Sequence, residues 1–242
     1  CMTTPDSQNN QNSPVNPYEV PLSAEFGVPA SALNDGQRHG EGSLETGTAG
    51  QYSFRVFDVI SEGFKLSNGH KLSINLAVLI MSMISIVASF IPFASWLIGG
   101  AFSLGMSWMG VRAAVGRRTE VGQIFDGFKL FGPLLGLYLL VLLLTMLGFL
   151  LLIIPGIYLS VAYMFALLVR YDKGIPVWDA MEASHKAITH NWFSFLGLII
   201  MLGLINMIGL VLMIGWIWTL PATLVTLGVV YRKVFGVEAK NV

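Results

Sequence analysis

Six long apolar segments, which fall into three pairs, constrain the fold of this chain more than any other feature. The pairs are 72–91 with 94–115, 132–153 with 156–170, and 193–213 with 216–232. Most segments are close to the length, about 20 residues, that an α-helix needs to cross about 30 Å of hydrocarbon. Because lipid offers no water, a spanning segment must satisfy its backbone hydrogen bonds internally, and an open segment does so only as a helix. The sequence therefore predicts an all-α integral membrane protein with six transmembrane helices, arranged as three helical hairpins.

The connections within and between the pairs differ in charge. The turns within pairs are IPFAS (91–95), IIPG (153–156) and MIGW (213–216), and none contains a charged residue. The Lys and Arg residues that follow residue 52 all lie before the first pair, after the last pair, or in and beside the connections between pairs. Loops rich in Lys and Arg stay in the cytoplasm, so both chain ends are expected on the cytoplasmic side.

The composition supports the membrane class. Charged residues make up 12% of the chain and hydrophobic residues 54%. A soluble domain carries about 25% charged residues, so the lipid bilayer is the expected main partner. Nothing in the composition suggests a nucleic-acid partner. Beyond residue 51, basic residues exceed acidic ones by five, which makes anionic lipid head groups a further candidate partner.

The first 51 residues differ from the rest. They are rich in Asn, Gln, Ser, Pro and Gly, hold six acidic residues and one basic residue, and are expected to be a disordered tail. The expected organisation is this tail (1–51), a membrane domain (52–236) and a short C-terminal tail (237–242). Cys1 is the single cysteine, so no disulfide framework is expected. The sequence MTTPDSQ from Met2 is typical of a translation start, which disfavours a lipid-modified Cys1.

A short word recurs in the chain, as EGFKL at 62–66 and DGFKL at 126–130. Each copy lies in an amphipathic stretch that precedes a hairpin, and VWDAMEASHKAI (177–188) takes the corresponding place before the third hairpin. Every hairpin then ends in Arg-x-x-x-Gly. The order of these features predicts three repeat units, at about 53–116, 119–174 and 177–236, each with a cytoplasmic interfacial helix followed by a hairpin.

Each predicted unit contributes one acid and one arginine to this pattern. The acids are Glu62, Asp126 and Glu182, and the arginines are Arg112, Arg170 and Arg232. An arginine at the end of a helix is often only a favourable partner of the helix dipole and of the membrane interface. The sharper hypothesis is that each acid pairs with an arginine of a neighbouring unit and closes the bundle with threefold order.

Intramembrane polar residues are few. No acidic, basic or His residue lies in the middle of a predicted segment, whereas ion-coupled pumps usually need one there. Asn75, Thr145 and Asn206 are the polar candidates within segments. They either form hydrogen bonds between helices or line a passive path.

Signatures of catalysis are also weak. Glu182 and His185, three residues apart, resemble half of a di-iron motif, but a second Glu-x-x-His is missing. No nucleophile elbow, P-loop or dinucleotide fingerprint occurs. We therefore expect no enzyme activity, no catalytic residue, no metal site and no cofactor.

Several short elements in the second half of the chain carry a family resemblance. They are IIPGIY (153–158), WDAMEAS (178–184), NWF (191–193) and LP (220–221). With them, residues 53–236 resemble a broad group of bacterial six-helix inner-membrane proteins that includes the membrane domain of some glycerophosphoryl diester phosphodiesterases. The resemblance implies a fold and a location in the bacterial inner membrane. It implies no active site, because its motifs are structural.

The function favoured by these observations is that of a non-enzymatic, multi-pass membrane protein. It would act as an accessory or scaffold in envelope or lipid homeostasis, and bind a second copy or another membrane protein. The alternative is a passive channel or transporter for a small molecule or lipid. A water-accessible path between the units favours the channel, and a dry, filled centre favours the scaffold.

Overall fold

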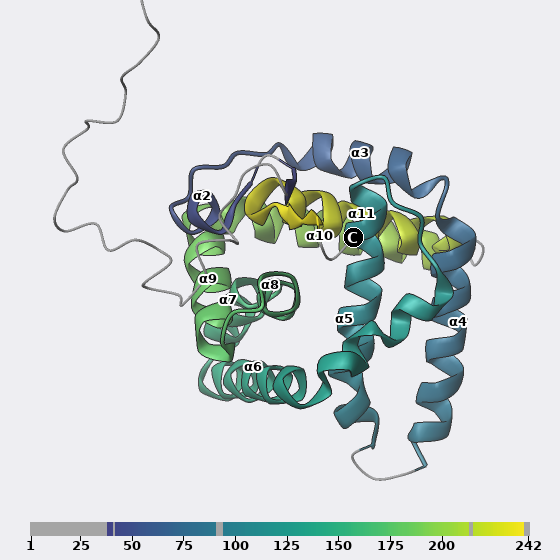
Figure 1. The fold of residues 1–242 in the computed structure, drawn as a ribbon, viewed down its shortest axis with the longest axis horizontal. Helices are drawn as coiled ribbons and strands as arrows, with labels where there is room; N and C mark the ends of the chain where they lie inside the picture. Colours follow the sequence, from purple (N-terminus) through teal and green to yellow (C-terminus); the bar gives the residue numbers. More distant parts are fainter. Residues whose placement is uncertain (1–37, 41, 91–93, 213–214, 240–242) are drawn as a thin grey trace, which may run out of the picture.

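The computed structural model describes residues 38–40, 42–90, 94–212 and 215–239, which are almost entirely helical (Figure 1). The elements are β1 (Arg38–His39), α2 (Leu44–Thr48), α3 (Val56–Ser67), α4 (Lys71–Ala88), α5 (Ala94–Ala114), the 3₁₀-helix η3 (Val121–Leu130), α6 (Phe131–Leu151), α7 (Ile153–Ala162), α8 (Ala166–Lys173), α9 (Val177–His190), α10 (Trp192–Val211), α11 (Trp216–Phe235) and β2 (Val237–Glu238). The predicted helical class is confirmed, with one antiparallel pair of two-residue strands, β1 and β2, added to it. Cys1 lies outside the described residues.

All six predicted segments form helices, but four helical segments of the described chain are long and apolar enough to cross a membrane. These are α4, α6, the consecutive α7–α8 segment and α10. Only 17–39% of the most apolar window of each is buried, so these helices direct most of their apolar surface outward. The fold is therefore that of a helical membrane protein, with four candidate spans where hydropathy predicted six.

The other two helices, α5 and α11, are less apolar because the protein itself surrounds them. They pack closely on each other, with Gly110 of α5 against Leu224 and Gly228 of α11. Both helices are lined with completely buried residues, such as Met109 and Val225. A helix enclosed by other helices is stabilised by close packing, so small and polar residues such as Ser107 are accepted in it. The mean hydropathy of such a helix is therefore lower than that of a helix that faces lipid.

The predicted span at 156–170 is interrupted. Helix α7 ends at Ala162 and α8 begins at Ala166. The backbone remains hydrogen-bonded across the break, because Tyr163 donates to the Leu159 carbonyl (3.0 Å) and Ala166 donates to the Tyr163 carbonyl (3.1 Å). Residues on both sides of the interruption are buried, Val161 and Ala162 in α7 and Leu168 and Val169 in α8.

Three short helices precede the hairpins, as the amphipathic stretches predict. Helix α3 packs along α11, η3 packs along α5, and α9 packs chiefly on α8 and also on α7. In Figure 1, α3 lies over α11 at the top, while η3 crosses α5 on the right. Each short helix thus rests on the second arm of a hairpin other than its own.

The two ends of the folded region depart from the expected tails. Residues 38–40 and 42–51 belong to the folded body rather than to a disordered tail, since Leu44, Gly47 and Thr48 of α2 are buried. At the other end, Val237 and Glu238 pair with β1 and are also buried. Residues 1–37 of the expected tail lie outside the described part.

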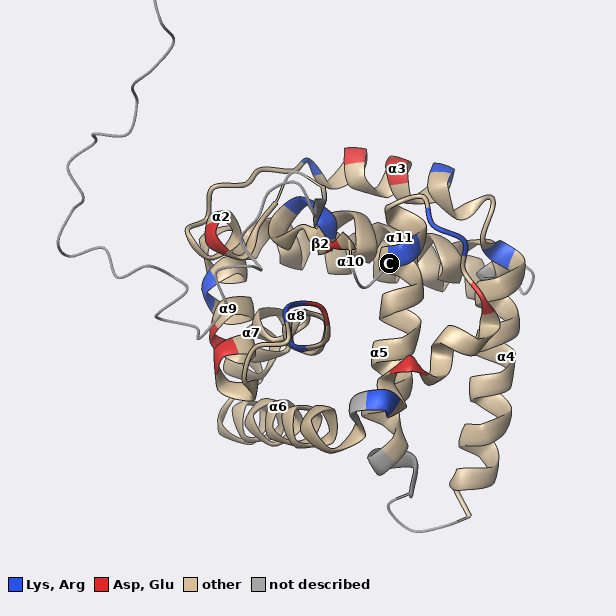
Figure 2. Ribbon diagram, viewed as in Figure 1, with Lys and Arg blue, Asp and Glu red and all other residues tan. Residues whose placement is uncertain are grey.

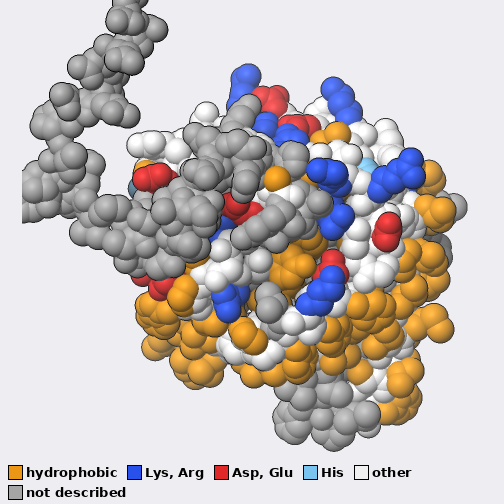
Figure 3. Space-filling model, in the orientation of Figure 1, with side chains coloured by type: hydrophobic (Ala, Val, Ile, Leu, Met, Phe, Trp, Pro, Cys, Tyr) orange, Lys and Arg blue, Asp and Glu red, His pale blue; other side chains and the backbone are white. Residues whose placement is uncertain are grey.

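Charged residues are confined to part of the molecule. Figure 2 shows them on α2, α3, η3, α8 and α9, near the ends of α5 and α11, and at the start of α4, while α6, α10 and the far half of α4 carry none. In Figure 3, hydrophobic side chains cover the lower rim and the right flank of the same view. The exposed large hydrophobic residues of the protein include Leu143 and Leu150 on α6 and Phe193 and Val211 on α10. Apolar surface of this extent requires lipid or a partner to cover it.

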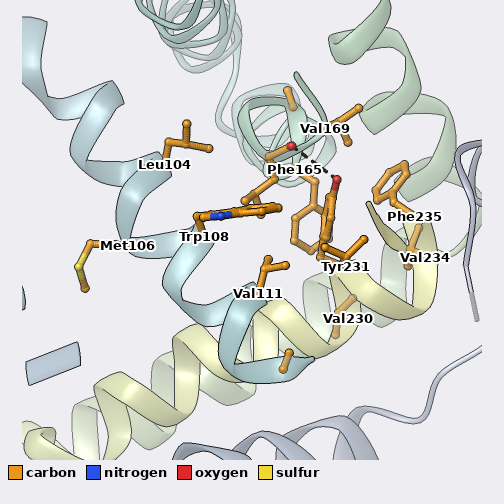
Figure 4. Packing of buried hydrophobic residues seen from close by; sticks show 14 of the residues in the cluster. Leu104, Met106, Trp108, Val111, Phe165, Val169, Val230, Tyr231, Val234 and Phe235 are labelled. Atoms are coloured by element: carbon orange, nitrogen blue, oxygen red, sulfur yellow. Dashed lines mark hydrogen bonds between the residues drawn. The ribbon is translucent and has the colours of Figure 1, made fainter. Parts of the chain in front are cut away.

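Large side chains fill the centre where α5, α8 and α11 meet (Figure 4). Trp108, Phe165, Tyr231 and Phe235 are each at most 1% exposed. Phe165 makes edge-to-face contacts with Tyr231 (5.7 Å between ring centroids) and Phe235 (6.2 Å). Such contacts add to the hydrophobic stabilisation of the core.

Candidate functional site

The recurring word marks two places where helices cross at close range. Gly63 of α3 lies against α11, and a methyl group placed on it would stand 2.8 Å from the Cα atom of Thr226. Gly127 of η3 lies against α5, where such a methyl would stand 2.8 Å from the backbone carbon of Ala101. No side chain fits at either distance. The glycine of each copy is therefore required by helix packing.

The acids of the pattern make three different contacts. Glu62 pairs with Arg232 and, at 3.1 Å, with Lys233, so it joins α3 to the end of α11. Asp126 instead pairs with Lys129 of its own helix (2.7 Å), and Glu182 with Lys186 of its own helix (3.0 Å). One of the three acids thus reaches an arginine of another hairpin.

The arginines mainly serve backbone carbonyls. Arg232 donates to the Ala114 carbonyl at the end of α5, and Arg170 donates to the Ile175 carbonyl just beyond α8. Neither Arg112 nor Arg170 pairs with a carboxylate within the part of the chain that the structure describes. Since the last carbonyls of a helix lack intrahelical partners, these contacts complete helix ends.

The Glu62 contact has an electrostatic consequence. Partial burial raises the pKa of Glu62, but the hydrogen bond from Lys233 and the positive charge of Arg232 outweigh that effect and hold the pKa below 4.5. The carboxylate is therefore charged at neutral pH and attracts both cations. Because Arg232 also reaches α5, this group joins α3, α5 and α11.

A buried charged cluster lies where α8 meets the C-terminal strand, and the sequence analysis did not predict it. Lys173 is 3.2 Å from Asp172 and 3.0 Å from Glu238, and it also donates to the Gly236 carbonyl (3.2 Å). The Tyr231 hydroxyl and the Glu238 backbone N–H both donate to Asp172, at 3.0 and 3.1 Å. Charges buried to this degree are tolerated only when paired and hydrogen-bonded.

A sequence signal for this cluster exists in RYDKG (170–174). Its middle residues are an adjacent acid and base, whereas the corresponding positions of RAAVG (112–116) and RKVFG (232–236) contain no such pair. The turn after α8 is closed by Gly174 in the left-handed conformation (φ 69°). The cluster fixes the end of the chain to the interior, which is a structural role.

Asn75 has a specific structural task. Its side-chain amide donates to the Ile217 carbonyl of α11 at 2.8 Å. That carbonyl would normally accept from the residue four positions later, but this residue is Pro221, which has no N–H. The Asn75 side chain therefore supplies, from α4, the donor that the proline removes.

The other two intramembrane polar residues are placed elsewhere. Asn206 of α10 donates to the Thr223 hydroxyl of α11 (2.6 Å) and to the Leu202 carbonyl (2.8 Å). Thr145 lies half-buried on α6. Asn75 and Asn206 thus both bond to α11, from α4 and α10, whereas Thr145 lies on α6.

The cavities that open on the surface of the described residues include the following three. One of about 430 Å³ lies between α4, α5 and α11 and contains Ser85, Ser103 and Ser107. Another of about 410 Å³ lies beside Arg232 and Lys233. The third, of about 320 Å³, lies between α7 and α9, and its lining includes Glu182 and His185. No group of three or more metal-ligating residues occurs within the described chain.

Comparison with known proteins found no matching family model, no matching curated protein and no matching solved structure.

Proposed function

We propose that this chain is a non-enzymatic, multi-pass protein of the bacterial inner membrane that acts as a scaffold in envelope or lipid homeostasis. The observation that carries the proposal is the filled centre formed by Trp108, Phe165, Tyr231 and Phe235. A scaffold needs a rigid interior and an apolar outer surface, and both are present here. The family resemblance to the phosphodiesterase membrane domains remains a prediction of the same kind.

The packing of the short helices supports a threefold repeat as part of this proposal. The helices that begin the second and third units rest on the second arm of the preceding hairpin, η3 on α5 and α9 on α7 and α8. The helix that begins the first unit, α3, rests on the second arm of the last hairpin, α11. The last of these contacts joins the first unit to the third and closes the ring. The Glu62–Arg232 pair lies at this closing contact.

The proposed orientation rests on the charges of the connections and places both chain ends in the cytoplasm. The packing of α4 on α11 does not follow from it, because the start of α4 and the start of α11, which the orientation assigns to opposite sides, are in contact (Lys71 Nζ lies 5.7 Å from the Trp218 ring). Exposed Arg117 and Arg118 between the first two hairpins would then face anionic head groups. Self-association through the exposed apolar faces is part of the same proposal.

Flux across proteoliposomes tests the scaffold against the channel. Protein reconstituted in vesicles with an entrapped fluorescent dye or ions should leave the vesicles as tight as empty ones, and a known pore-former serves as the positive control. Solute-selective leakage would contradict the scaffold.

One observation favours the passive channel as the second candidate. The cavity between α4, α5 and α11 places three serines in an otherwise apolar cleft. If leakage occurred through it, Ser103→Trp would block the flux, while the substitution of exposed Leu143 by Trp on α6 would leave the flux unchanged.

A further inference from the structure

The cavity between α7 and α9 combines aromatic walls with negative charge. It is lined by Tyr163, Trp178, Met181, Glu182 and His185. The four residues from α9 follow the spacing i, i+3, i+4 and i+7, which places them on one face of that helix. Tyr163 faces them from the break between α7 and α8.

The walls of this cavity are held in place by neighbouring groups. The His185 ring accepts or donates a hydrogen bond with the Tyr158 hydroxyl (3.0 Å), and that hydroxyl also contacts Thr189 (2.9 Å). The Tyr163 ring lies 6.0 Å from the His185 ring. Met181 is 3% exposed and closes the floor, whereas Trp178 is 65% exposed at the rim. The site is therefore largely formed before any ligand arrives.

One lining residue of the cavity is acidic, Glu182, and a second acid, Asp179, lies near it on the same helix. Glu182 pairs with Lys186, and Asp179 lies one turn before Glu182 on α9. Partial burial and the nearby charge of Glu182 both raise the pKa of Asp179. A negative potential of this kind attracts a cation.

The chemistry of the walls selects the kind of cation. A primary ammonium carries three N–H donors that need acceptors, and one oxygen of Glu182 is already engaged by Lys186. A quaternary ammonium carries no donor and is attracted to the faces of Trp and Tyr rings. Its methyl groups also suit a thioether floor.

We propose that this cavity binds a trimethylammonium group, either of free choline or of a phosphatidylcholine head group. The position of α9 fits the lipid source, because Trp178 belongs to a helix that the sequence places at the membrane interface, where Trp is common. The proposal goes beyond the scaffold function and does not depend on it.

The test uses the full chain in nanodiscs of phosphatidylglycerol and phosphatidylethanolamine, with 5-fluorotryptophan at the Trp positions. The fluorine resonance of Trp178 is assigned by its loss in Trp178→Phe. Choline chloride should shift this resonance saturably, and ethanolamine should bind at least 10-fold more weakly. Exchanging phosphatidylethanolamine for phosphatidylcholine distinguishes the sources: a lipid ligand shifts the resonance before choline is added, whereas a soluble ligand leaves that shift to the added choline.

Matched variants separate the site from general effects. For these, binding is followed by the displacement of radiolabelled choline, which needs no Trp178 signal. Trp178→Ala should weaken binding at least 10-fold and Asp179→Asn about threefold, whereas Trp218→Phe, an exposed tryptophan on α11, should leave it unchanged. Trp178 is largely exposed and Asp179 is half-buried, so the fold should survive both substitutions, as circular dichroism would verify. No saturable shift with choline or phosphatidylcholine, equal binding of ethanolamine, or unchanged binding by Trp178→Ala would each overturn the proposal.

Discussion

The contact between Asn75 and Pro221 can be tested quantitatively, because each residue explains the presence of the other. Asn75 donates at 2.8 Å to the Ile217 carbonyl, whose usual intrahelical donor is missing at Pro221. Asn75→Leu keeps most of the side-chain volume but removes this donor. The carbonyl then loses a partner, which costs roughly 1–3 kcal/mol where no water can replace the donor. This contact is exposed on the protein, so lipid must be what excludes the water.

Two considerations lower that figure. Hydrogen bonds between transmembrane helices average about 0.6 kcal/mol, with a maximum of about 1.7. The buried Asn75 Oδ1 has no hydrogen-bond partner among the described residues, so the substitution also removes an unsatisfied acceptor. We therefore expect Asn75→Leu to lower the free energy of unfolding by about 1 kcal/mol.

A double-mutant cycle with Pro221→Ala isolates the effect. The alanine restores the backbone N–H, so the Ile217 carbonyl no longer depends on Asn75. Reversible unfolding in mixed micelles should then show that Asn75→Leu costs less than about 0.3 kcal/mol in the Pro221→Ala background. An equal cost in both backgrounds would refute the proposed exchange of donors.

Three further predictions concern the packing and the charges. Gly127→Ala should lower the free energy of unfolding by about 1–3 kcal/mol because its methyl would meet α5, whereas Gly122→Ala, in the same 3₁₀-helix with open space around it, should be nearly neutral in thermal melts. Lys173→Met should destabilise the fold by about 3–5 kcal/mol, because two buried carboxylates lose a shared cation, and an unchanged melting temperature would argue against the cluster. The pKa of Glu62 is depressed in the folded state, so the ionised carboxylate stabilises the fold above pH 4.5, and this stabilisation is lost as the pH falls through the lower pKa of the folded state. Glu62→Gln should therefore remove part of the acid sensitivity of unfolding. An identical dependence of the free energy of unfolding on pH in both proteins would contradict this.

Hydrophobic periodicity and charge placement predicted most of the helices, because both reflect the demands of lipid and water on each segment separately. The boundaries of α4, α5, α6, α10 and α11 lie within about three residues of the predicted segments. What these signals do not contain is which helix is surrounded by other helices. Hydropathy therefore treated α5 and α11 as equals of α4, although they form the centre.

The short helices show a second limit. With 3.6 residues per turn, the second one would have an apolar stripe of Val121, Ile124, Phe125 and Phe128. The segment is a 3₁₀-helix, in which residues three apart align, so Ile124 and Gly127 face α5 while Phe125 is 43% exposed. Similarly, periodicity places Phe57 on one apolar face with Ile60 and Phe64, but Phe57, at the start of α3, is 72% exposed.

The folded segment before residue 52 was missed for a different reason. Its composition is polar, and its contacts depend on long-range packing that composition does not reveal. Helix α2, for example, packs on α9 and α11, and Gly47 lies directly against the backbone of Val234. The Asp172–Lys173–Glu238 cluster was not predicted from the sequence either, because its residues meet only where α8 and β2 come together in the fold.

The most direct test of the account is the side of the membrane on which the charged connections lie. In a Cys1→Ser background, Arg117→Cys and Ile154→Cys introduce single thiols at a charged connection and at an uncharged hairpin turn. A membrane-impermeant maleimide should label the Ile154→Cys variant in intact cells and the Arg117→Cys variant only after permeabilisation. Labelling of the Arg117→Cys variant in intact cells would contradict the proposed orientation and the three-hairpin arrangement built on it.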